Sequence, residues 1–184
     1  MKKLVMLIAV AVAAVGVQAA TLSWSITNVI GPSGDNAPEG TLVALFAAGT
    51  EYDHAAAVAG TLTPTYTGTT AAMGTTGATR AGSSGNGSYS AGDTASFYAV
   101  VYDASTIAGA NNYVISDVVS ATVGSAGANI SLAYGSMKGT TTANKFKNAL
   151  DNGGWSSATG SPEPTSGLLL LIGGAMLALR RKRA

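Results

Sequence analysis

The sequence predicts a mainly β protein, an antiparallel β-sandwich of the Ig-like or jelly-roll-like type. Short segments rich in Val, Ile, Tyr and Thr recur along the middle of the chain, separated by turns of Gly, Asn and Asp. These segments do not alternate with long helices, which argues against a parallel α/β sheet. The chain also has no repeat of fixed period, which argues against a solenoid.

The first expected strand covers residues 21–30, TLSWSITNVI. Leu22, Trp24 and Ile26 fall on one face and Thr or Ser residues on the other, a period of two that is typical of a half-buried strand. The segment that follows, GPSGDNAPEG at 31–40, is rich in Gly, Pro, Asp and Asn and is expected to form a turn or loop.

An interior strand and a short helix are expected next. Residues 41–47, TLVALFA, are apolar on both faces, as a strand inside a sheet requires. Residues 51–60, EYDHAAAVAG, combine helix formers with a Gly stop, which predicts a short helix. Residues 60–92 are mostly Gly, Thr, Ser and Ala, and we interpret them as loops with one edge hairpin or as a flexible insertion.

Strand patterns return in the second half of the chain. The expected strands are SFYAVVYD (96–103), NYVISDVVSATV (112–123) and ANISLAYG (128–135). Residues 141–152 predict a short helix, because Phe146 and Leu150 lie four residues apart and share a helical face. The predicted domain therefore spans residues 20–153, and residues 154–161 are expected to form a linker.

The charged residues are unevenly distributed. The chain has ten Lys and Arg against nine Asp and Glu, a net charge of +1. Six of the basic residues lie near the two ends: Lys2, Lys3, Arg180, Arg181, Lys182 and Arg183. The residues between them keep four basic side chains against nine acidic ones, a net charge of −5. We expect no nucleic-acid partner, because neutralising phosphates requires clustered Lys and Arg.

The N-terminus has the three parts of a secretory signal peptide: two lysines, an apolar stretch over residues 4–15, and small residues ending at Ala19. The apolar stretch is shorter than the roughly 20 residues that span a bilayer. We therefore expect a signal helix over residues 1–19, cleaved between Ala19 and Ala20, that takes the chain out of the cytoplasm.

The sequence offers few candidates for catalysis. It has no cysteine, which excludes disulfides, thiolate catalysis and thiolate metal sites. His54, its only histidine, lies beside Asp53, but no Gly-x-Ser-x-Gly elbow accompanies them, so a solvated loop or helix-end histidine is expected.

The acidic residues are also better explained by structure than by chemistry. Paired carboxylates for glycoside hydrolysis would come from the strand-flanking residues Asp93, Asp103 and Asp117, for which turn roles are simpler. A calcium site would use Asp35, Asn36 and Glu39, but these lack the alternating spacing of a calcium loop. We expect no catalytic residue, no metal and no cofactor.

The chain closes on SPEPTSGLLLLIGGAMLALRRKRA, residues 161–184. Residues 167–179 are apolar and would form a helix of roughly 20 Å, short against a hydrocarbon core of about 30 Å. The basic residues at 180–183 would stay on the cytoplasmic side and halt translocation. This pattern predicts a short transmembrane helix at the C-terminus.

These features together resemble the PEP-CTERM sorting signal of Gram-negative bacteria. The resemblance implies that an exosortase, a membrane cysteine protease or transpeptidase, recognises the motif, removes the tail and passes the protein to the cell surface or matrix. It implies three sets of residues: the motif Pro162, Glu163 and Pro164, a membrane segment at 168–179, and the stop-transfer residues Arg180, Arg181, Lys182 and Arg183. Ser161 departs from the apolar residue that many members carry there.

The function expected from the sequence is that of a non-enzymatic exported protein. Its partners would be the secretion translocon, an exosortase, the membrane (transiently) and exopolysaccharide. It would cross the inner membrane, be anchored transiently, and end at the cell surface or in the extracellular matrix. The alternatives are a carbohydrate-binding or calcium-dependent adhesion module, for which Trp155 is the aromatic residue expected to be exposed, and, more remotely, a surface glycan hydrolase.

Overall fold

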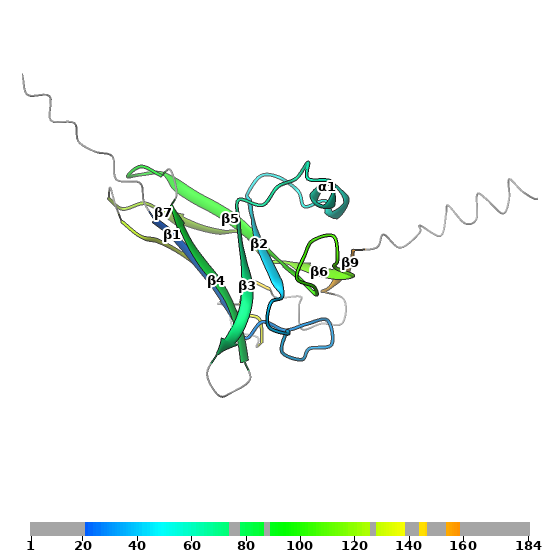
Figure 1. Ribbon diagram of the computed structural model, residues 1–184. Helices are drawn as coiled ribbons and strands as arrows, with labels where there is room; N and C mark the ends of the chain where they lie inside the picture. The colour runs from blue at the N-terminus through cyan, green and yellow to red at the C-terminus, as the bar shows by residue number, and fades with distance from the viewer. Residues whose placement is uncertain are drawn as a thin grey trace, which may run out of the picture.

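The computed structural model describes residues 21–73, 78–86, 89–125, 128–138, 144–146 and 154–158. These residues form a mainly β fold with a short helix (Figure 1), so the mainly β part of the prediction is confirmed. The elements are β1 (Thr21–Thr27), β2 (Leu42–Ala47), α1 (His54–Val58), β3 (Tyr66–Met73), β4 (Ala78–Asn86), β5 (Thr94–Tyr102), β6 (Asn112–Ile115), β7 (Val119–Thr122), β8 (Ile130–Ser136) and β9 (Ser156–Ser157).

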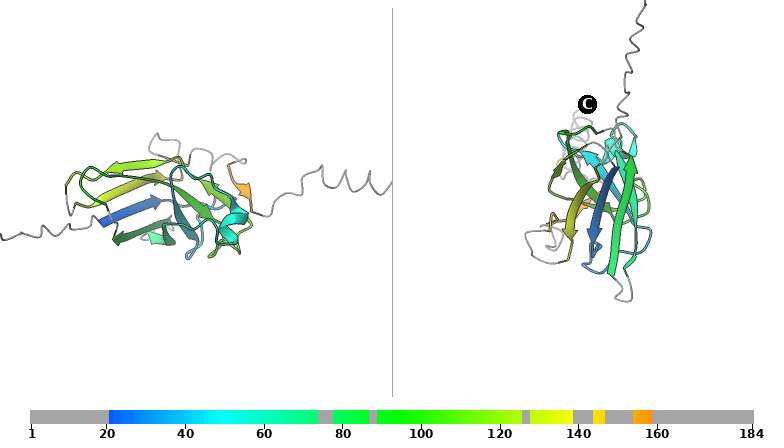
Figure 2. Two further views of the ribbon diagram at one scale, coloured as in Figure 1. Left: turned by 90° about the horizontal axis from the view of Figure 1, so that it is seen from above. Right: turned by 90° about the vertical axis from the view of Figure 1, so that its left-hand side faces the viewer.

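The strands join into one curled open sheet in the order β8-β1-β4-β3-β2-β5-β6-β9, with β7 also paired to β5. The sheet turns within β3, whose residues 66–69 pair with β2 and whose residues 70–73 pair with β4. Figure 2 shows the curl from two further sides. The ladders are antiparallel except that between β1 and β8, which is parallel and which the sequence did not lead us to expect.

The main core lies inside the curl. In β1, Leu22, Trp24 and Ile26 are buried in alternation with less buried neighbours, which confirms the predicted period of two. Other fully buried members of this core are Val43, Leu45, Val101, Leu132, Tyr134, Met137 and Phe146. The core therefore draws on strands from both ends of the sheet.

The segment 60–92 differs most from expectation. It forms β3 and β4, which lie inside the sheet order and not at an edge or in an insertion. Small residues are needed there because the indole of Trp24 packs on β3: a Cβ added at Gly68 would lie 2.9 Å from Cζ2 of Trp24. The absence of large apolar side chains suggested loops, but at Gly68 it leaves room for the large ring of Trp24 to pack against β3.

Two other predicted segments are also corrected. Residues 112–123 form two strands, because the Oγ of Ser116 accepts a hydrogen bond from the Ala99 N–H at 2.8 Å and interrupts the ladder with β5. Residues 154–161 are not simply a linker, because 156–157 form β9, which pairs with β6. Trp155, expected to be exposed, is partly buried against the main core.

The remaining predictions about the ends fall mostly outside the described residues. These include the signal helix at 1–19, the C-terminal helix at 168–179, and most of the helix expected at 141–152, of which only 144–146 are described and are not helical. No helix within the described parts of the chain is both long and apolar enough to cross a membrane.

Candidate functional site

A second apolar cluster, called the outer cluster here, lies on the face of β2 and β5 away from the main core. It consists of the buried residues Ala44, Phe46, Tyr98, Val100, Tyr102 and Ala110. Tyr52, Leu62, Ile107 and Tyr113 are partly buried against it. This second cluster explains why residues 41–47 are apolar on both faces, since both faces of β2 are covered.

The helix α1 begins at His54, beside the outer cluster, and Asp53 is its N-cap residue. One carboxylate oxygen of Asp53 accepts hydrogen bonds from the N–H groups of Ala55, at 2.9 Å, and Ala56, at 3.2 Å. The helix ends at Val58, before Gly60 with a φ of 75°. The short helix predicted at 51–60 is therefore confirmed, and His54 is its first residue.

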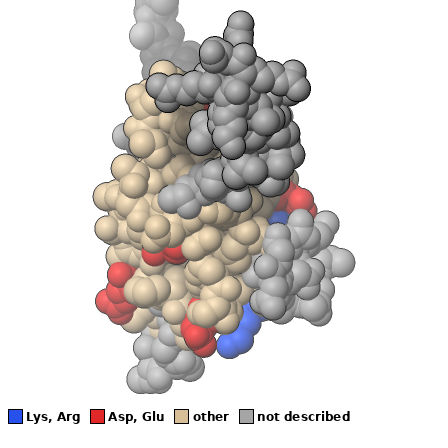
Figure 3. All heavy atoms as spheres, turned by 90° about the vertical axis from the view of Figure 1, so that its right-hand side faces the viewer, with Lys and Arg blue, Asp and Glu red and all other residues tan. Residues whose placement is uncertain are grey.

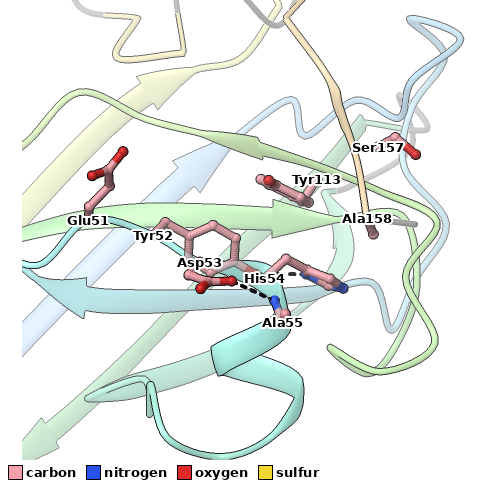
Figure 4. Close-up of a pocket in the computed structure, with 8 residues that line it drawn as sticks. All are labelled: Glu51, Tyr52, Asp53, His54, Ala55, Tyr113, Ser157 and Ala158. Atoms are coloured by element: carbon pink, nitrogen blue, oxygen red, sulfur yellow. Dashed lines mark hydrogen bonds between the residues drawn. The ribbon is translucent and has the colours of Figure 1, made fainter. Parts of the chain in front are cut away.

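A surface pocket of about 520 Å³ opens at the start of α1 (Figure 4). Its lining comes from three separate segments: Glu51, Tyr52, Asp53, His54 and Ala55 around the start of α1, Tyr113 in β6, and Ser157 and Ala158 at β9. The volume lies within the range of about 300 to 1,000 Å³ that is typical of small-molecule sites.

Hydrogen bonds tie the pocket to the buried part of the outer cluster. The hydroxyl of Tyr52 lies 2.9 Å from that of Tyr102 and 3.0 Å from Nδ1 of His54. We assign Tyr102 as the donor to Tyr52 and Tyr52 as the donor to Nδ1, which satisfies all three groups with a neutral imidazole. In this tautomer, Nε2 of His54 carries the proton and has no partner among the described residues.

The three rings at the pocket also contact one another. The His54 ring stacks on Tyr113 with centroids 5.3 Å apart and planes 7° apart. Tyr52 meets Tyr113 edge-on at 4.9 Å and 61°. These geometries are favourable for aromatic pairs and hold the rings in place.

Burial in the outer cluster changes the acidity of its tyrosines. Loss of solvent raises the pKa of Tyr52 to about 12, and the hydrogen bond from Tyr102 opposes this increase. The pKa of Tyr102 is raised further, first by burial and then by its hydrogen bond to Tyr52. Both hydroxyls are therefore protonated at neutral pH.

We expect the protein to lose stability in alkali because of these tyrosines. Because the pKa of Tyr52 is higher in the folded state, its protonated hydroxyl contributes to the free energy of unfolding. This contribution is complete below the ordinary pKa of 10.0 and is lost as the pH rises to about 12. Denaturant titrations at increasing pH should show this loss, and tyrosinate absorbance should appear at higher pH in the native protein than in urea. Identical absorbance titrations with and without urea would contradict it.

The acidic residues that were considered for catalysis have structural contacts. Asp53 caps α1, and Nδ1 of His54 is hydrogen-bonded to the hydroxyl of Tyr52. Asp93 accepts a hydrogen bond from the Ser90 N–H at 2.7 Å, which fits the turn role expected for it.

Asp103 closes the connection between β5 and β6. Its carboxylate oxygens accept hydrogen bonds from the Asn111 N–H at 2.8 Å and from Nδ2 of Asn112 at 2.9 Å. The turn role predicted for Asp103 is thus confirmed, and it also fixes the start of the strand that carries Tyr113. Asp117 lies in the break between β6 and β7, where its N–H donates to the Lys145 carbonyl at 2.8 Å.

The possible calcium loop has ordinary turn contacts. Asp35 accepts a hydrogen bond from the Ser33 hydroxyl at 3.0 Å, and Asn36 forms a bridge with Ile30. Within the described ranges, no group of three or more His, Asp or Glu side chains is placed to hold a metal ion. Figure 3 shows acidic side chains scattered over a mostly uncharged face.

The sequence indicated His54 and Asp53 but not the rest of the pocket. Tyr113 and Ser157 reach it because β6 pairs with β5 and β9 pairs with β6, beside the start of α1. The residues of the sorting prediction lie outside the described residues: Ala19, Ala20, Pro162, Glu163, Pro164, Arg180, Arg181, Lys182 and Arg183.

The fold and the pocket define a mainly β protein with an aromatic-lined site on the outer face of its sheet. Comparisons with models of protein families, with curated proteins and with solved structures found no match to this chain.

Proposed function

We propose that this chain is a non-enzymatic exported protein, sorted through its C-terminus, whose β domain works at the cell surface or in the extracellular matrix. The observation that carries the proposal is the position of the described strands along the sequence. The strand β1 begins at Thr21, directly after the expected cleavage site, and β9 ends at Ser157, before the Pro162-Glu163-Pro164 motif. Both proposed cleavages would therefore leave every described strand intact.

The chemistry of the two ends supports this proposal. Prolines on both sides of Glu163 favour an extended backbone, which a processing enzyme can bind. The apolar stretch before the basic residues at 180–183 would hold that site at the membrane surface. The partners in this scheme are the secretion translocon and an exosortase.

The domain between the ends is proposed to be a β-sandwich made from the two arms of the curled sheet. A lack of catalysis is supported by the structural roles of Asp53, Asp93 and Asp103, whose carboxylates cap a helix or close turns. A display or binding role fits such a domain better than hydrolysis does.

The mass of the intact protein recovered from the cell surface tests the sorting proposal. We expect a chain that starts at Ala20 and lacks the tail beyond the motif, in cells with an active exosortase. Replacing Pro162, Glu163 and Pro164 together by Ala should leave the tail in place, whereas the matched control Thr159→Ala should be processed normally. Recovery of the unaltered protein with its tail intact would contradict the proposal.

A further inference from the structure

The pocket at the start of α1 has several polar groups that the fold does not use. Nε2 of His54 and the hydroxyl of Tyr113 have no hydrogen-bond partner among the described residues. The same is true of the carboxylate of Glu51, which is exposed at the rim of the pocket. The pocket therefore offers a donor and a hydroxyl next to aromatic rings, and a carboxylate acceptor that lies apart from the rings at its rim (Figure 4).

The aromatic part of the pocket is held in place before any ligand arrives. The strand β6 that carries Tyr113 pairs with β5 on one side and β9 on the other, opposite Tyr102 and Ser156. His54 is held by its bond to Tyr52 and its stacking on Tyr113. Rigid groups lose little entropy on binding, so even a few contacts give measurable affinity.

The charges at the pocket disfavour anionic ligands. Its lining includes two carboxylates, Glu51 and Asp53, and no Lys or Arg. Anionic ligands such as uronates or phosphates would be repelled, because no cationic side chain compensates these carboxylates. A neutral ligand with many hydroxyls would be able to donate to Glu51 and accept from Nε2 of His54.

We propose that this pocket binds a neutral pyranose unit of a glycan. The apolar face of the sugar ring packs on Tyr113 and its neighbouring rings, and a hydroxyl of this sugar accepts from Nε2–H of His54. A hydroxyl of the adjoining sugar unit donates to the Glu51 carboxylate at the rim. This site goes beyond the proposed sorting of the protein and does not depend on it. It also differs from the site suggested by the sequence, since Trp155 contributes to the main core and does not line the pocket.

Saturation-transfer NMR and calorimetry on the purified protein test the site. The probes are neutral trisaccharides of glucose, mannose and galactose, together with trigalacturonate and choline as charged counterparts. We expect at least one neutral trisaccharide to bind and both charged probes to bind more weakly. The absence of binding by every neutral probe, or stronger binding of trigalacturonate or choline, would overturn the proposal.

Variants separate the pocket from nonspecific binding. Glu51→Gln keeps the shape of an exposed side chain and should weaken binding about tenfold, because the amide oxygen accepts the hydrogen bond without the negative charge that strengthens it. The matched control Glu39→Gln, at an exposed glutamate that does not line the pocket, should bind as the unaltered protein does.

A second variant tests the ring platform. Tyr113→Val keeps a residue suited to a strand but removes the ring, and should abolish measurable binding while thermal unfolding confirms that the domain is folded. Equal affinity of Glu51→Gln and Glu39→Gln, or undiminished binding by folded Tyr113→Val, would overturn the proposal. Binding is measured on purified protein, so its failure is distinguishable from a failure of sorting in the cell.

Discussion

Gly68→Ala is expected to lower the free energy of unfolding by about 2 to 3 kcal/mol, a typical effect of overpacking a core. The new Cβ would lie 2.9 Å from Cζ2 and 3.0 Å from Cη2 of Trp24, and 3.2 Å from the carbonyl oxygen of Gly82. Trp24 is only 3% exposed, so its ring has no open space into which to move. Urea denaturation of the purified variant measures the loss.

Two further variants test whether Trp24 is the cause. Gly31→Ala is the matched control, since a Cβ there meets nothing within 4 Å, and its effect should stay within about 0.5 kcal/mol. In a Trp24→Leu background, Gly68→Ala should be less harmful by about 1 to 2 kcal/mol, because the two ring atoms it would meet are gone and only the Gly82 carbonyl oxygen remains. If the penalty of Gly68→Ala were the same in both backgrounds, Trp24 would not pack on β3 as described.

The parts of the fold that were predictable are those in which the local pattern reports burial directly. The alternation of Leu22, Trp24 and Ile26 identified β1, apolar residues on both faces identified β2 as an interior strand, and the apolar and aromatic residues of β5 identified it as a strand. The helix α1 was recognisable from its alanines and the Gly that follows it. In these segments, each residue's neighbours in the sequence already indicate its surroundings.

The place of β3 and β4 inside the sheet was not predicted, because their fit depends on a distant partner. Gly68 is informative only when Trp24, far away in the sequence, is known to lie on it. The parallel pairing of β1 with β8 also depends on residues far apart in the sequence, since Leu22 pairs with Ile130. No local period encodes either relationship, so the sequence patterns predicted loops with an edge hairpin, or an insertion, where the structure has strands inside the sheet.

The candidate site was predictable only in part for a similar reason. His54 and Asp53 stood out in the sequence because they are adjacent and chemically distinctive. Tyr113 did not, because an aromatic residue in a strand is more often part of a core. Its position beside His54 follows from the pairing of β6 with β5 and β9, which the sequence does not specify.

Phe46→Ala is expected to lower the free energy of unfolding by about 3 to 4 kcal/mol, because a fully buried ring is replaced by a cavity. Phe46 is 1% exposed, stacks on Tyr98 at 5.7 Å and meets Tyr52 edge-on at 5.3 Å. Since Tyr52 positions His54, the variant should also weaken binding of the neutral trisaccharide. Urea denaturation and calorimetry on the same sample measure both effects.

Tyr98→Phe is the matched control for this prediction, and its effect should have the opposite sign. The hydroxyl of Tyr98 is buried and has no hydrogen-bond partner among the described residues. In Tyr98→Phe the cost of removing this hydroxyl from water on folding is gone, so the fold should be stabilised by up to about 1 kcal/mol. The ring that stacks on Phe46 stays in place. Equal losses for Phe46→Ala and Tyr98→Phe would mean that the two rings do not share a closely packed outer cluster. Changes of opposite sign in the free energy of unfolding would show that the outer cluster beneath the pocket is stabilised by packing of these rings and not by their polar groups.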